Sequence, residues 1–231
     1  MRALLLVLAL WPGMALAGAW PRAAGEVYLS TGQEFGEDGW SGIYAEVGGP
    51  RDLTFGLDAG GHVAAGLNAY RTGLTPTPEV DGRVIAFVRV PIAPAGMVER
   101  FPAWVAAVEL GLGADFEAES ELELSPRARL ALSVGRPLST RLGDGWMNVD
   151  MRIEPGGAAT RYGLGVVVGA RPRERLTVEM GVFAEAEADS ATVTFAPTVQ
   201  YAVPRIGDVR LGVSVGLDGG ARLRIGLART F

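Results

Sequence analysis

The chain has 231 residues, of which 48% are hydrophobic and 20% are charged, and its formal net charge is −5. It contains no cysteine, which excludes a disulfide framework, a zinc–thiolate site and thiol catalysis. The mild acidity argues against nucleic acid as a partner, because binding to phosphates depends on basic surfaces.

The first 17 residues have the pattern of a secretory signal peptide. Arg2 supplies the positive start, residues 3–10 form an apolar run, and Ala15-Leu16-Ala17 is a small-x-small cleavage site. A transmembrane anchor is the alternative, but the run is shorter than the roughly 20 residues that a membrane-spanning helix needs. We therefore predict a signal peptide (1–17), a short periplasmic N-terminal segment (18–24) and one barrel domain (25–231).

Twelve segments with strand-like alternation follow one another, separated by turns rich in Gly, Pro, Asp and Arg. Their lengths centre on the roughly 9–11 residues that a tilted strand needs to cross the hydrocarbon layer. An even strand number places both ends of the chain on the periplasmic side, and a count of ten is the alternative. The predicted strands are 25–33, 40–48, 53–61, 82–91, 103–114, 127–136, 146–154, 161–170, 176–186, 192–203, 209–218 and 221–231.

The predicted strands have one apolar face and one face that carries the charges. In one strand, Leu130, Leu132 and Val134 alternate with Arg129 and smaller residues. Arg on a lipid-facing position at the bilayer midplane costs about 2–4 kcal/mol, and the apolar faces of the clearest strands carry no Arg, Asp or Glu. The sequence therefore predicts an all-β fold, a closed antiparallel transmembrane β-barrel of about twelve strands. A soluble periplasmic lipocalin-like barrel, whose apolar face would point inward, is the alternative.

The opposite faces are predicted to line the lumen. Their charged residues are Glu26, Asp58, Arg89, Glu109, Arg127, Arg129, Asp150, Arg152, Glu179, Arg210 and Arg224. Opposite charges on neighbouring strands can pair, which predicts the pairs Arg89–Glu109, Glu109–Arg129 and Arg129–Asp150, and places Glu26 near Arg222 and Arg224. These charges form either a structural network that fills a narrow barrel or a lining that selects solutes. Inward glycines such as Gly56 and Gly181 are expected to leave open space.

Alternate turns differ in length and charge. Residues 33–39, 61–81, 115–126 and 155–160 are predicted to be outward-facing loops, and 91–102 and 137–145 to be long periplasmic turns. Residues 115–126 contain five acidic residues at alternate positions. They are either an ordinary solvated loop or a divalent-cation site near lipopolysaccharide.

The sequence offers little support for catalysis. His62 is the one histidine, and no serine lies near it in sequence. Asp58 could orient its ring, but no nucleophile completes a triad. We therefore interpret His62 as a loop or rim residue and predict that the protein is not an enzyme and holds no cofactor and no metal.

The last 23 residues form a hairpin signal around Gly219-Gly220 and end in an aromatic residue. Gly226 and Phe231 match the closing-strand signal of bacterial outer-membrane barrels, whereas Arg229 stands where that signal usually has a hydrophobic residue. With the signal peptide and the alternating strands, the chain resembles Gram-negative outer-membrane β-barrel proteins. The resemblance implies location in the cell outer membrane, surroundings of lipid and lipopolysaccharide, and assembly by the barrel-assembly machinery, with Gly226 and Phe231 as the assembly signal.

Two functions remain open from the sequence. The first is a non-enzymatic, porin-like barrel that acts as a narrow passive channel for small polar solutes. The second is a structural or surface-binding barrel with a closed, salt-bridged lumen. A soluble lipocalin-like binding protein is less favoured.

Overall fold

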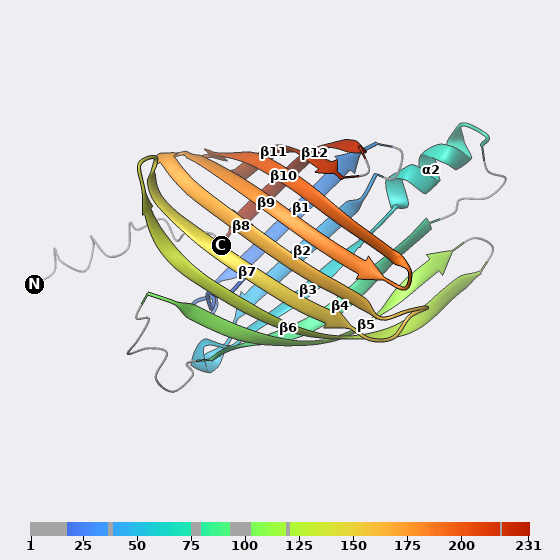
Figure 1. Cartoon of the computed structure of the whole chain (residues 1–231), viewed down its shortest axis with the longest axis horizontal. Coiled ribbons are helices and arrows are strands. Elements are labelled where there is room, and N and C mark those ends of the chain that lie inside the picture. The colour runs from blue at the N-terminus through green and yellow to red at the C-terminus, as the bar shows by residue number, and fades with distance from the viewer. Residues whose placement is uncertain (1–17, 37–38, 75–79, 93–102, 119–120, 218) are drawn as a thin grey trace, which may run out of the picture.

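A computed structural model describes residues 18–36, 39–74, 80–92, 103–118, 121–217 and 219–231. In this part of the chain, twelve strands hydrogen-bond in chain order and close through a β1–β12 pair into an antiparallel barrel (Figure 1). The fold and the strand count predicted from the sequence are confirmed. The strands are β1 (Val27–Phe35), β2 (Ser41–Gly48), β3 (Thr54–Gly61), β4 (Val80–Ile92), β5 (Val105–Ala118), β6 (Leu122–Thr140), β7 (Gly143–Glu154), β8 (Arg161–Arg173), β9 (Leu176–Glu187), β10 (Ser190–Val203), β11 (Gly207–Gly216) and β12 (Ala221–Thr230).

The strand register directs the apolar face of each strand outward. Leu130 on β6 lies opposite Leu110 on β5 and Ile153 on β7, and about half of the surface of Leu110 and Leu130 is exposed. Such contacts continue from strand to strand, so the outer surface is an apolar belt. An exposed apolar surface of this extent fits lipid rather than water. The outward direction of this face argues against the lipocalin-like alternative, which needs it to point inward.

The two ends of the barrel differ (Figure 1). At one end, tight turns join β6 to β7, β8 to β9 and β10 to β11, and Tyr28 near the start of β1 pairs with Thr230 at the end of β12. At the other end lie the helix α2 (Val63–Arg71) and the tip of the long β5–β6 hairpin. Following the predicted topology, we name these the periplasmic end and the outer end.

Two predicted loops are mostly strand. β5 and β6 continue through most of 115–126, where Phe116 lies opposite Leu124 and Glu117 lies opposite Glu123. Apolar and acidic residues alternate in this segment, so the ladder extends with the apolar side chains outward. The segment 137–145 contracts in the same way, because β6 and β7 continue to the pair Thr140–Gly143.

The predicted loop 61–81 contains the helix α2, which begins directly after His62. Residues 93–102, most of the predicted periplasmic turn 91–102, lie outside the described residues, as does the predicted signal peptide. No helix in the described part of the chain has the length and hydropathy to cross a membrane.

Candidate functional site: the barrel lumen

Alternate residues of β2, β4 and β5 point into the lumen and carry paired charges. The Arg89 guanidinium donates to Oε1 of Glu46 (2.5 Å) and to Oε2 of Glu109 (2.8 Å). It also donates to the Tyr44 hydroxyl at 2.9 Å. All three charged side chains are buried. A buried charge is tolerated when it is paired and hydrogen-bonded, and this cluster satisfies both conditions.

A second cluster surrounds Glu154 at the outer end of β7. Its carboxylate is fully buried and accepts a hydrogen bond from Nε of Arg129 at 2.6 Å. Arg129 also donates to Asp58 at 2.6 Å and lies 3.5 Å from Glu109, so it joins the two clusters. Three further guanidinium groups lie within 4.0 Å of the Glu154 carboxylate: Arg83, Arg152 and Arg161. We name the two clusters together, from Glu46 and Arg89 to Glu154 and its four arginines, the charged network.

The network contains two of the three predicted ion pairs. Arg89–Glu109 and Glu109–Arg129 are formed, but the predicted pair of Arg129 with Asp150 is wrong. The register places Ser133 opposite Asp150, whereas Arg129 lies one step beyond the pair Leu130–Ile153 and therefore beside Glu154. Asp150 instead accepts hydrogen bonds from Ser133 and Asn148.

The remaining predicted lumen residues are paired along the wall. The partners are Arg22 for Glu26, Asp115 and Glu187 for Arg127, Glu185 for Arg152, Glu179 for Arg210 and Glu34 for Arg224. The predicted proximity of Glu26 to Arg224 is wrong. β1 and β12 are antiparallel, so Arg224 lies opposite Glu34 near the outer end, and Glu26 lies at the periplasmic end.

Four members of the network were missed from the sequence: Glu46, Arg83, Glu154 and Arg161. A usable signal existed, because each lies an even number of residues from an inward residue on its own strand. Glu154 follows Asp150 and Arg152 by this spacing, and Arg83 precedes Arg89 by it. Position at a strand end hid Glu154 and Arg83, since strand boundaries are the least certain part of a sequence-based assignment.

Residues 18–26, which we name the N-terminal strap, cross the lumen at the periplasmic end. Arg22 bonds through its side chain to Glu46 on β2 (2.6 Å) and through its backbone N–H to Thr54 on β3 (3.1 Å). The backbone N–H of Ala19 bonds to Oδ1 of Asn148 on β7 (3.2 Å). In the closed strand order, β7 lies across the barrel from β1 and β2, so the strap spans the lumen. Ala19 and Arg22 are buried there.

Three of the inward glycines, Gly56, Gly163 and Gly181, do not leave the open space that was expected, whereas Gly212 lines a cavity. A Cβ on Gly56 would collide with the ring of Phe87, and one on Gly181 would lie 2.6 Å from the ring of Phe183. Gly163 is covered in the same way by the side chain of Arg152. The covering side chain comes from a neighbouring strand at Gly56 and Gly163 and from the same strand at Gly181. The interior beside these glycines is packed rather than open.

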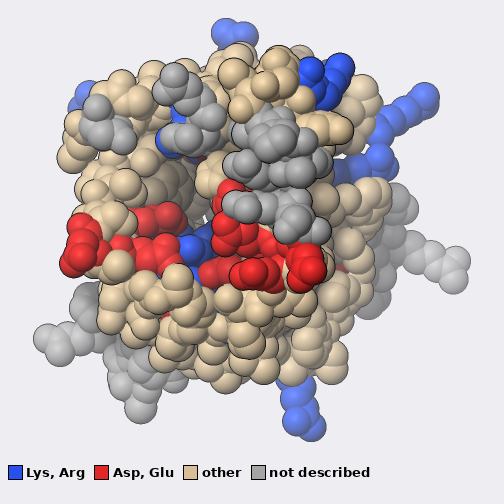
Figure 2. All heavy atoms as spheres, turned by 90° about the vertical axis from the view of Figure 1, so that its right-hand side faces the viewer, with Lys and Arg blue, Asp and Glu red and all other residues tan. Residues whose placement is uncertain are grey.

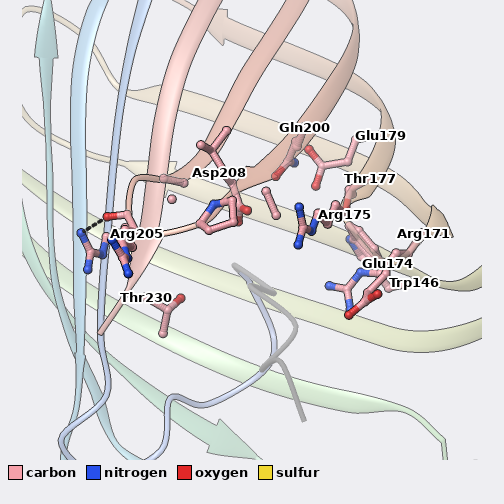
Figure 3. A pocket seen from close by; sticks show the side chains of 16 residues that line it. Trp146, Arg171, Glu174, Arg175, Thr177, Glu179, Gln200, Arg205, Asp208 and Thr230 are labelled. Atoms are coloured by element: carbon pink, nitrogen blue, oxygen red, sulfur yellow. Dashed lines mark hydrogen bonds between the residues drawn. The ribbon is translucent and has the colours of Figure 1, made fainter. Parts of the chain in front are cut away.

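In the described part of the chain, two cavities lie mainly along the wall formed by β8–β12 and β1–β3. The larger has a volume of about 420 Å³ and lies at the periplasmic end, where Arg175, Glu179, Gln200 and Asp208 surround it (Figure 3). The smaller, about 220 Å³, lies toward the outer end. Its small and polar lining includes Ser30, Gly32, Thr198, Gly212 and Gly226. Arg210 lines the outer cavity and Glu179 the periplasmic one, and these two side chains pair at 3.0 Å.

Acidic side chains gather around the opening at the outer end (Figure 2). Asp81, Glu117 and Glu123 lie in a row across β4, β5 and β6. Within the described residues, no group of three or more His, Cys, Asp or Glu has an arrangement that could hold a metal ion. His62 lies at this rim and contacts Asp81 (2.9 Å) and the ring of Trp40. Asp58, which the sequence offered as its partner, binds Arg129 instead.

The two residues of the predicted assembly signal lie at different places on β12 and its end. Gly226 faces the lumen beside Arg210. Phe231 follows β12, exchanges backbone hydrogen bonds with Val27 on β1, and exposes most of its ring. The C-terminal residue is therefore part of the seam that closes the barrel.

Comparisons with known proteins reveal the fold class. No family model and no curated protein matches the sequence. The KdgM porin, also solved in complex with disordered oligogalacturonate, superposes with a TM-score of 0.57 at 10% identity, over 88% of this chain and 99% of the porin. An outer membrane channel from Pseudomonas putida F1 gives a TM-score of 0.53 at 12% identity, over 96% of this chain and all of the channel. The chain has the fold of outer-membrane β-barrels, a class that includes porins and channels.

Proposed function

We propose that the protein is a non-enzymatic barrel of the bacterial outer membrane that acts as a narrow passive channel for small polar solutes. The observation that carries the proposal is the pair of cavities on one wall of the lumen, whose linings meet at the ion pair Arg210–Glu179. The apolar outer surface and the likeness to outer-membrane barrels support the location.

The proposed path contacts the charged network only at its edge, where Tyr44 and Asp58 line the outer cavity. Glu46, Glu109 and Arg129 are buried by their partners on the opposite wall, so they support the barrel rather than contact solutes. The path has neutral polar residues, among them Ser30, Thr198 and Gln200, together with charged residues of both signs, such as Arg175 and Asp208. Such a lining offers hydrogen bonds and charges of both signs to a hydrated polar solute.

The pair Arg210–Glu179 is the proposed constriction. Arg210 is 31% exposed and Glu179 14%, so water reaches the pair from the cavities. A partly exposed pair is weak, with a typical value of about 0–1 kcal/mol. Thermal motion of the two side chains can therefore open the connection between the cavities.

Conductance across a planar bilayer tests the path. The double variant Arg210→Ser with Glu179→Ser should form a larger ohmic conductance than the native protein, because two long side chains leave the constriction. The matched control is Arg161→Ser with Glu187→Ser, a pair with the same 3.0 Å separation that lines neither cavity. Its conductance should equal that of the native protein.

Two results would contradict the proposal. Silence from folded native protein and from the double variant would favour the closed, salt-bridged barrel that the network and the strap would support. Equal conductance of native protein and both variants would place the path elsewhere in the lumen. Catalysis is tested separately: purified protein should be inert on phospholipid, lipid A and peptide substrates, and turnover abolished by His62→Ala would refute the non-enzymatic assignment.

A further inference from the structure

Asp150 differs from the other carboxylates that point into the centre of the lumen. Its Oδ1 accepts a hydrogen bond from Ser133 and its Oδ2 one from Asn148, both of which are neutral donors. Glu46, Glu109 and Glu154 each have a guanidinium group within 4.0 Å. Among the described residues, Asp150 forms no such ion pair. Its negative charge is held by hydrogen bonds, and Arg89 and Arg152 act on it only from beyond ion-pair distance.

The start of the N-terminal strap lies against the same group of side chains. A Cβ on Gly18 would lie 2.6 Å from Oδ1 and 2.7 Å from Cγ of Asn148, so the Gly18 backbone is packed directly on this amide. Gly18 has φ +105°, a conformation that suits glycine. The next backbone N–H, from Ala19, donates to Oδ1 of the same Asn148.

Trp20 of the strap adds a contact with β6, the strand next to β7. Its ring lies over Gly135, which leaves no room for a Cβ there, and Gly135 is the residue directly opposite Asn148 in the β6–β7 ladder. The fully buried Ala19 lies between the two contacts. The first residues of the strap are therefore fixed at one point of the wall, beside the Asp150 carboxylate.

We propose that the chain is cleaved after Ala17 and that the new α-ammonium group of Gly18 binds at the site formed by Ser133, Asn148 and Asp150. Hydrolysis of the Ala17–Gly18 peptide bond by a signal peptidase consumes one water, leaves a carboxylate on Ala17 and releases an amine on Gly18 that takes up one proton. The ammonium group supplies the cation that Asp150 lacks and has three N–H donors. Cleavage thereby anchors the strap across the lumen. This inference does not depend on whether the lumen conducts solutes.

The composition of the chain allows a direct test. The sequence contains no lysine, so the α-amine at the N-terminus is the one primary amine of the mature protein. An acylating reagent applied near neutral pH therefore labels that amine alone. An ion pair with a carboxylate holds an amine in its protonated, unreactive form, and burial hinders the reagent.

Intact mass of protein purified from outer membranes should correspond to a chain that starts at Gly18. The α-amine of the folded barrel should react at least about tenfold more slowly than that of heat-denatured protein. A tenfold lower rate corresponds to a pKa of the amine that is about one unit higher in the folded barrel. Asp150→Asn removes the charge and keeps the shape, and it should raise the labelling rate of the folded barrel toward the denatured rate. The control Glu187→Gln, a carboxylate at the outer end of β9 that pairs with Arg127 and Arg161 and lines neither cavity, should leave the rate unchanged.

Several results would overturn the inference. A different start in the intact mass would refute the cleavage site. Equal labelling rates of folded and denatured native protein would refute docking of the amine, and this comparison remains decisive if Asp150→Asn does not fold. Slow labelling that Asp150→Asn leaves unchanged would show that burial, and not this carboxylate, protects the amine.

Discussion

Glu154→Gln should destabilise the barrel more than any exposed charge change. The amide has nearly the same shape as the carboxylate, so the substitution removes one negative charge and leaves packing in place. Four guanidinium groups would then surround a neutral side chain: Arg83, Arg129, Arg152 and Arg161. Removal of one partner from a buried ion pair costs about 3–5 kcal/mol. Here the four arginines would be left to share their other carboxylate partners, Asp58, Glu109, Glu185 and Glu187.

The expected effect is large enough to measure by heat-modifiability, the temperature at which the folded band on an SDS gel converts to the unfolded band. For a domain of this size, 1 kcal/mol corresponds to a shift of about 2–4 °C. The conversion of Glu154→Gln should therefore occur roughly 10 °C below that of the native protein. Glu34→Gln is the control, because its pair with Arg224 is partly exposed and such pairs contribute only about 0–1 kcal/mol.

A Glu154→Gln barrel that converts within about 2 °C of native protein would refute the reasoning. So would an equal loss in Glu34→Gln, since it would show that charge at any lumen position has the same effect. Either result would mean that the arginines around Glu154 are satisfied by water.

Two further predictions concern the two faces of the wall. Val166→Arg places a charge on the lipid face, so it should cost about 2–4 kcal/mol and reduce the yield of heat-resistant barrel in the outer membrane. The control Thr198→Arg changes a residue that lines the outer cavity, and it should assemble normally. Equal yields would show that Val166 does not face lipid. Gly181→Ala should cost about 1–3 kcal/mol through overpacking against the ring of Phe183. The control Gly32→Ala should be neutral in the same heat-modifiability assay, because its added Cβ would lie 3.8 Å from its nearest neighbour. Equal stability of both glycine variants would indicate an interior loose enough to relax.

The sequence predicted the fold because a barrel wall has a strict two-residue period. Leu130 and Leu132 share one face, and Arg127 and Arg129 share the other, whatever the tertiary contacts are. The hydrophobic pattern therefore revealed the strand count and the direction of each face without any knowledge of register. Residues 115–126 were misassigned as a loop because of their high acidic content. Their acidic residues alternate with apolar residues such as Leu122 and Leu124, which is the same two-residue period as in the other strands.

Pairing required information that the two-residue period does not contain. Whether Arg129 meets Asp150 or Glu154 depends on the register of β6 against β7, which the turn at 141–142 sets. The length of that turn was overestimated, so the partner was displaced along the strand. The prediction of open space beside Gly56 was wrong for a related reason. Phe87 covers Gly56 from the next strand, and the sequence of one strand does not show which side chains cross from its neighbour.

The position of the N-terminal strap lay beyond sequence reasoning for a different reason. Residues 18–24 have no periodicity, and their contacts reach Thr54 and Asn148, which are distant in sequence. The strap meets the charged network where Arg22 bonds to Glu46. Ser30, Thr198 and Gln200 lie on another part of the wall. This division relates the two functions that the sequence left open. A salt-bridged interior and a solute path are compatible in one barrel when the buried charges are confined to one wall. The remaining question is then local: whether the single pair Arg210–Glu179 opens.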